Sequence, residues 1–167
     1  MQLTKYITLI VLFLFCGCGY RFSGGEGLLS GKVHDISVRI FENKSRWSDL
    51  DIIVTNDIVS KLRQSRSVNF VQNPLEYVLC GTIERVHVDT LSRSSDGTPQ
   101  EKFVEITISV YISDLKGNKI WQSSVTEREA YFPAQSHTLT LHAQKEAMAE
   151  ASARLADWVM NELGQGF

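Results

Sequence analysis

Few side chains in this sequence are spaced for catalysis. His87-Val88-Asp89 would place two potential metal ligands on one face of a strand, whereas His137 and His142 are five residues apart and do not share a helix face. Serine, histidine and aspartate are all present, but the sequence contains no nucleophile elbow, no metalloprotease helix motif and no paired cysteine ligands. We therefore interpret His87 and Asp89 as a surface pair, and predict that the protein is not an enzyme.

The sequence does indicate covalent chemistry at a cysteine near its start. Lys5 precedes an unbroken apolar run over residues 7–15, which is too short to cross a bilayer as a helix and is typical of a secretory signal. Gly17 then stands directly before Cys18, a pattern that resembles the lipobox of bacterial lipoproteins. Residues 1–17 are therefore predicted to be cleaved, although an ordinary signal peptide with an incidental cysteine is the alternative. Cys18 would carry a diacylglycerol on its sulfur and an acyl chain on its amine, which together anchor far more firmly than one chain.

Charge and cysteine content narrow the classes of protein further. The net charge of −2 over 167 residues lacks the basic surplus that bulk nucleic-acid binding needs, so no nucleic-acid partner is expected. After cleavage and lipidation Cys80 would be the remaining thiol, and we predict that it is buried and unpaired. Apart from the acyl chains on Cys18, no cofactor or metal is predicted. Gly19 is not the aspartate that commonly retains lipoproteins in the inner membrane, which favours the periplasmic face of the outer membrane.

Beyond the cysteine, the sequence predicts a lipidated flexible leader over residues 18–32 and a single α+β domain over residues 33–167. Alternating or short apolar runs predict strands, and apolar stripes of helical period predict helices. The strands are expected at 35–41, 68–71, 77–91, 103–113 and 119–131, and the helices at 48–65 and 136–163. Because both helices must bury their stripes, we expect two helices packed on one face of a mostly antiparallel four- to five-stranded sheet, with the other face polar.

Two local signals predict how the long strands pair. The apolar positions of strand 77–91 change parity midway, which requires an extra residue and predicts a bulge near Glu84-Arg85. Gly117-Asn118 suits a two-residue hairpin turn, which would set Val110 opposite Val125.

Basic residues are expected to gather at one end of this sheet. Loop 92–100 and segment 132–138 should fall at the same end, because the strands between them run up and down. Arg93, Lys102 and His137 can then meet there, with Arg128 not far below. Cations beside helix N–H groups suit phosphate recognition, and a solvated hairpin end is the plainer alternative.

The polar face of the sheet could lie against water or against the polar lumen of a barrel. Phe103 and Tyr111 are expected on that face, where aromatic side chains suit an interface. We therefore predict both as contacts with a partner.

Two short motifs resemble the LptE family of lipopolysaccharide-assembly lipoproteins. Cys18-Gly19-Tyr20-Arg21-Phe22-Ser23-Gly24 looks like the mature start of the family, and Ile36-Ser37-Val38-Arg39-Ile40-Phe41-Glu42-Asn43 resembles its first strand. The order of the later elements agrees, so the likeness covers most of the mature chain.

This resemblance implies a non-enzymatic outer-membrane lipoprotein that plugs and helps assemble an LptD-type β-barrel, and that takes part in inserting lipopolysaccharide into the outer leaflet. In the family the basic residue of the hairpin loop is linked to lipopolysaccharide contact, and Arg93 occupies the corresponding loop here. An outer-membrane lipoprotein of similar architecture that serves another envelope complex, such as a secretin or transport machine, is the alternative.

Overall fold

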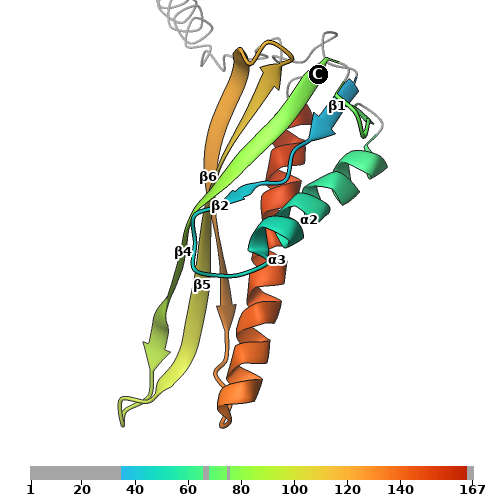
Figure 1. The fold of residues 1–167 in the computed structure, drawn as a ribbon. Helices are drawn as coiled ribbons and strands as arrows, with labels where there is room; N and C mark the ends of the chain where they lie inside the picture. The colour runs from blue at the N-terminus through green and yellow to red at the C-terminus, as the bar shows by residue number, and fades with distance from the viewer. Residues whose placement is uncertain (1–34, 66–67, 75, 165–167) are drawn as a thin grey trace, which may run out of the picture.

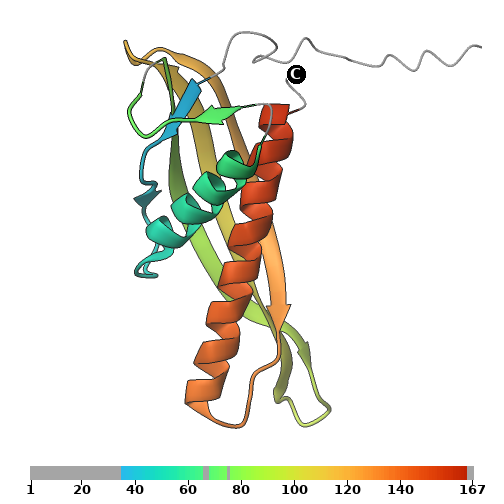
Figure 2. The ribbon, with the colours of Figure 1, turned by 90° about the vertical axis from the view of Figure 1, so that its right-hand side faces the viewer.

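A computed structural model of the chain describes residues 35–65, 68–74 and 76–164. The predicted signal segment, Cys18 and the leader therefore lie outside the described residues. In chain order the elements are β1 (Asp35–Val38), β2 (Glu42–Asn43), α2 (Leu50–Gln64), β3 (Asn69–Phe70), β4 (Tyr77–Arg93), β5 (Pro99–Asp114), β6 (Lys119–Tyr131) and α3 (His137–Gly164). Both helices cover the same side of the sheet, as predicted, and leave its other side uncovered by helices (Figure 1; Figure 2).

The sheet is mixed and has six strands in the described residues, so the predicted mostly antiparallel sheet of four to five strands is wrong. Its main path runs β3-β1-β4-β5-β6, and β2 pairs with β4 beside that path. β1 runs parallel to β3 and β4, and β2 runs parallel to β4, whereas β4, β5 and β6 are antiparallel. The physical reason is that α2 carries the chain back across the sheet between β1 and β3, and a helical crossover joins strands that point the same way.

The first predicted strand, 35–41, is divided in the structure. β1 ends at Val38, and pairing resumes only at Glu42. Between them the alternation fails, because Phe41 turns into the core with 2% of its surface exposed and Ile40 is 66% exposed. The Phe41 ring, which is larger than the Ile40 side chain, occupies the core. This segment therefore contributes one buried aromatic side chain and does not form a regular strand.

The core fills the space between the helices and the sheet, and the predicted stripes supply it. Fully buried members include Val54, Ile58 and Leu62 of α2, Leu155 and Val159 of α3, and Ile106 and Ile108 of β5. Each such side chain stabilises the fold by about 1.5–3 kcal/mol relative to exposure. α2 covers only part of the sheet, and α3 runs on past it to the end where β4 and β5 connect (Figure 1). Leu139, in the first turn of α3, is 61% exposed there and lies outside the core.

The long strands show one confirmed and one corrected prediction. The pairing of β4 with β5 shifts between Ile83 and Arg85, which confirms the bulge at Glu84-Arg85. The predicted two-residue turn at Gly117-Asn118 is wrong, because a four-residue connection joins β5 to β6. Its shape is fixed by Asp114, whose carboxylate accepts hydrogen bonds from the backbone N–H groups of residues 116 and 118 at 2.9 and 2.8 Å.

Together with an irregularity in the pairing between Ile112 and Ser113, the longer turn moves the register of β6 by two residues. Val125 lies opposite Ile108, where the sequence predicted Val110. A shift of two keeps the side chains from Trp121 onward on their predicted faces, since successive residues of a strand alternate between faces. The two faces were therefore predicted correctly, while the partners across the strands were not.

Candidate functional site

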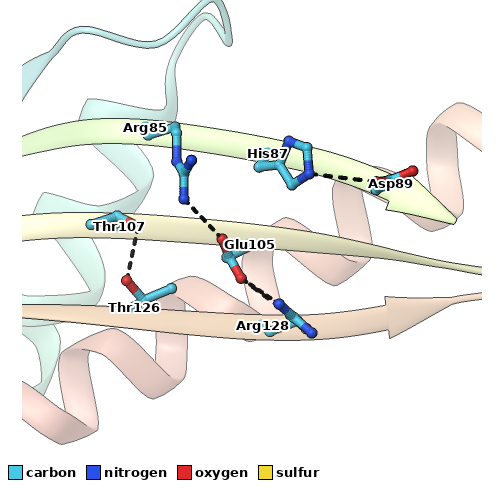
Figure 3. Close-up of polar contacts among 7 residues, drawn as sticks. All are labelled: Arg85, His87, Asp89, Glu105, Thr107, Thr126 and Arg128. Atoms are coloured by element: carbon cyan, nitrogen blue, oxygen red, sulfur yellow. Dashed lines mark hydrogen bonds and ion pairs between the residues drawn. The ribbon is translucent and has the colours of Figure 1, made fainter. Parts of the chain in front are cut away.

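The uncovered side of β4, β5 and β6, called here the open face, carries a polar network that crosses all three strands (Figure 3). Glu105 lies at its centre and directly opposite Arg128. An oxygen of its carboxylate accepts a hydrogen bond from Arg128 Nη2 at 2.6 Å, and the other accepts one from Arg85 Nη2 at 3.2 Å. The Glu105 side chain is only 13% exposed, whereas those of Arg85 and Arg128 are 66% and 54% exposed. The network therefore presents two cations to the outside around one shielded carboxylate.

The hydrogen bond from Arg128, more than the charges of Arg128, Arg85 and His87, holds the pKa of Glu105 below its ordinary value of 4.5. A carboxyl whose pKa is lower in the folded state contributes stability above its unfolded pKa, and loses that contribution as the pH falls through its folded pKa. In Glu105→Gln this charge is absent at every pH. We expect the wild type's advantage in unfolding free energy to shrink from about pH 6 to about pH 3, as measured by urea denaturation of both proteins. A constant difference across that range would contradict this assignment.

The two aromatic residues predicted as interface contacts both lie on the open face, each beneath a cation. The Arg128 guanidinium carbon lies 4.2 Å from the ring centre of Phe103, and the Lys119 ammonium lies 4.2 Å from that of Tyr111. Phe103 is consequently only 8% exposed. The outermost layer at both places is the cation, so a partner would meet charge before it met an aromatic ring. The interface role of Phe103 and Tyr111 stays a prediction.

The half of the open face nearest the β5–β6 turn contains a hollow of about 480 Å³. Hydroxyl, carboxylate and amide groups line most of it, together with the Lys119 ammonium, and its lining includes Thr82, Glu84, Ser109, Tyr111, Gln122 and Ser124. Cys80 pairs with Tyr111 across β4 and β5. Its thiol, through a hydrogen bond, raises the pKa of the Tyr111 hydroxyl. Cys80 is buried as predicted, and it is the free cysteine of the described chain, but it lies on the open-face side and not among the helices.

The four basic residues predicted to gather are spread over both faces and one end of the sheet. Arg93 ends β4 opposite Pro99, and its Nη1 donates a hydrogen bond to the Gly97 carbonyl at 3.0 Å. The loop between these strands is tighter than the predicted nine residues. Lys102 lies opposite the buried Tyr131 and so belongs to the helix side, whereas Arg128 is on the open face.

His137 is the first residue of α3 and is exposed. The start of α3 and the β4–β5 loop lie at the same end of the molecule, as predicted (Figure 1; Figure 2). We call this end the tip. The tip also carries apolar side chains that the sequence interpretation missed as surface residues: Leu91, Phe132 and Leu139 are 51%, 71% and 61% exposed. Phe132 directly follows the end of β6, and this position at the end of a strand could have indicated that its side chain is exposed.

In the described part of the chain, no three His, Cys, Asp or Glu side chains come together as a metal site would require. No described helix combines the length and the apolar character needed to cross a membrane.

Comparison with known proteins shows to which family the domain belongs. The family model LptE, described as lipopolysaccharide-assembly, matches residues 33–163. No curated protein matches the chain. Among solved structures, rare lipoprotein B from Shewanella oneidensis is similar over 78% of this chain and 94% of its own, with 16% identity and a TM-score of 0.58.

Two other lipoproteins share the fold. Lipoprotein B from Nitrosomonas europaea is similar over 76% of this chain and 79% of its own, with 10% identity and a TM-score of 0.52. A minor lipoprotein from Acinetobacter baumannii is similar over 77% of this chain and 89% of its own, with 17% identity and a TM-score of 0.50. At these identities the solved structures show the fold alone. The family model covers all but the last residue of the described domain, and the chain belongs to the LptE family of lipopolysaccharide-assembly lipoproteins.

Proposed function

We propose that the protein is an outer-membrane lipoprotein, held at the periplasmic face through Cys18, whose domain plugs and helps assemble an LptD-type β-barrel during lipopolysaccharide insertion. Membership of the LptE family supports the lipopolysaccharide-assembly role. The plug role is supported by the open face. Pull-down from detergent-solubilised envelopes tests it, with a large barrel protein recovered in equal amount as the expected result.

The open face suits a polar surrounding in its composition and its pairing. None of the strongly exposed large apolar side chains of the described chain lies within residues 103–111 or 122–128, the parts of β5 and β6 that form its middle. Thr107 and Thr126 share a hydrogen bond at 2.9 Å. Glu105 forms ion pairs with Arg85 and Arg128 on the two neighbouring strands. The lumen of a transmembrane barrel is itself polar, so such a face can lie against it without burying unpaired charge.

The anchor makes a prediction of its own. Gly17-Cys18 after the apolar run leads us to expect cleavage before Cys18 and lipid on its sulfur and amine. Mass spectrometry of the mature N-terminus from native membranes should show the added acyl mass on Cys18. Recovery of an unmodified cysteine, or of another N-terminus, would refute the lipid anchor while leaving the plug role open.

The tip provides the proposed contact with lipopolysaccharide phosphates. Arg93 carries a planar, permanently charged fork, which suits a phosphate better than an ammonium does. We expect Arg93→Asp to lower lipopolysaccharide affinity about tenfold, or about 1.4 kcal/mol, because it replaces attraction with repulsion. The melting temperature should barely change, since surface substitutions usually stay within about 0.5 kcal/mol.

Binding of the purified protein to lipopolysaccharide at low and moderate salt measures this effect. Lys116→Asp is the matched control, because it makes the same charge change in the turn at the opposite end of β5. Adding Lys102→Asp to Arg93→Asp tests whether the helix side of the tip takes part. Unchanged lipopolysaccharide affinity in the double variant would mean that this loop is a solvated hairpin end with no role in lipopolysaccharide binding.

A further inference from the structure

β6 lies at the edge of the sheet, and in the described chain it forms a ladder with β5 alone. Its alternate residues must therefore point their backbone N–H and C=O groups outward. Two contacts show which residues of β6 these are. The Arg128 carbonyl accepts a hydrogen bond from Arg154 Nη2 of α3 at 2.8 Å, and Thr126 meets Thr107 through side chains at 2.9 Å, as close non-hydrogen-bonded pairs do. The even-numbered residues of β6 are thus the outward ones.

Arg154 closes one half of this edge. Besides the Arg128 carbonyl, it holds the carboxylates of Glu127 and Glu129, the first with an Nε–Oε2 distance of 3.4 Å. A charged side chain across an edge is a common protection against pairing with another strand. Among the described residues, no charged side chain is seen to bridge the half of β6 nearer its start in this way.

The uncovered half is uncharged and bordered by a hollow. Residues 120–126 read Ile-Trp-Gln-Ser-Ser-Val-Thr, with charged residues on both sides of the stretch. A hollow of about 310 Å³ lies beside it, lined by Lys119, Ile120, Trp121 and Gln122. Trp121 and Val125 pack against the core and are only partly buried. An uncharged edge without proline is where a further strand adds most readily.

We propose that this stretch pairs antiparallel with the same stretch of a second copy, about a two-fold axis through Ser123. Gln122 then faces Ser124 of the other copy twice, and both are outward residues, so each pair exchanges two backbone hydrogen bonds. Trp121 faces Val125 twice on the helix side, which is a favourable aromatic and β-branched pair. The sheet continues across the axis with the helices of both copies on one side.

The sequence of the edge selects this register and this occupant. A shift by two residues in one direction sets Trp121 opposite Glu127, which Arg154 already holds, and a shift in the other direction sets Trp121 opposite Ser123. A symmetric pair uses the β6 edges of both copies and closes about its two-fold axis, so no third copy can add at β6. A barrel wall is not an alternative occupant, because a closed barrel has no free edge. The pairing therefore does not rest on the proposed function.

Sedimentation of the mature chain carrying Cys18→Ala, which removes the lipid, tests the proposal over about a hundredfold range of concentration. We expect the average mass to rise from one chain towards two. Ser123→Lys and Ser123→Glu each place like charges opposite each other at the axis, and each should weaken association about tenfold or more. Mixing the two variants should restore dimers as a mixed pair. A wild type that stays monomeric, or single variants that dimerise as well as wild type, would overturn the proposal.

Gln122→Pro provides a second test if either charged variant fails to fold. It removes one outward N–H and no hydrogen bond to β5, and proline is tolerated on an edge in that orientation. The melting temperature should stay close to wild type and the chain should remain monomeric. Dimers of this variant with wild-type affinity would also overturn the proposal.

Discussion

Gly81→Val is expected to lower the free energy of unfolding by about 3 kcal/mol, at the upper end for an overpacked core. A Cβ atom at this position would lie 2.1 Å from Cε2 of Phe41 and 2.3 Å from its Cζ. The ring cannot yield cheaply, because Phe41 is 2% exposed and its backbone N–H donates to the Thr55 hydroxyl of α2 at 3.1 Å. Either the ring leaves the core or β4 moves away from β2, and both disturb the strands that carry the open face.

Urea denaturation measures the loss, and Phe41→Leu supplies the control. The smaller side chain should relieve the contact, so Gly81→Val should cost distinctly less when Phe41→Leu is already present. Residues in direct contact are coupled in this way, whereas independent sites add. Additive losses in the double variant would show that Gly81 is needed for a reason other than the ring.

This contact also shows why part of the fold could not be predicted from the sequence. A close approach of Phe41 to Gly81 joins residues forty positions apart, and no local pattern marks it. The crossover that makes the sheet mixed is of the same kind, since α2 looks alike from the sequence whether the strands beside it run parallel or antiparallel. Two periodic signals were reliable by contrast: the change of parity near Glu84 predicted the bulge, and the apolar stripe through Val54 and Ile58 predicted the buried face of α2.

In the candidate site, too, local patterns predicted some features and could not predict others. Because side chains alternate between faces, the sequence correctly placed Phe103 and Tyr111 on the polar face, even with the register wrong by two residues. It missed that Arg128 pairs with Glu105, because that depends on the length of the turn. The face of Lys102 was available from the start, since it has the parity of the buried Val104. The tight loop after Arg93 could not be predicted, because β4 and β5 continue towards it through residues that have no apolar pattern.

Thr126→Trp is expected to reduce recovery of the proposed barrel partner about tenfold in pull-downs from solubilised envelopes. Thr126 is exposed at the middle of the open face, opposite Thr107, and its side chain is far from the core layer behind the sheet. Tryptophan suits a strand, so the domain should keep its stability to within about 1 kcal/mol. A surface packed against a lumen wall has no room for the larger ring, and overpacking of about 1–3 kcal/mol corresponds to tenfold or more in affinity.

Lys116→Trp provides the matched control, because it adds the same ring in the turn beyond the open face and should leave recovery unchanged. Arg93→Asp should also leave recovery unchanged, since its expected defect is in lipopolysaccharide affinity. The two substitutions therefore separate the roles: a defect of Thr126→Trp in barrel recovery alone, together with a defect of Arg93→Asp in lipopolysaccharide binding alone, assigns docking to the open face and ligand contact to the tip. Full barrel recovery by a stable Thr126→Trp protein would mean that the open face is not packed against the wall, and that the paired charges around Glu105 face water.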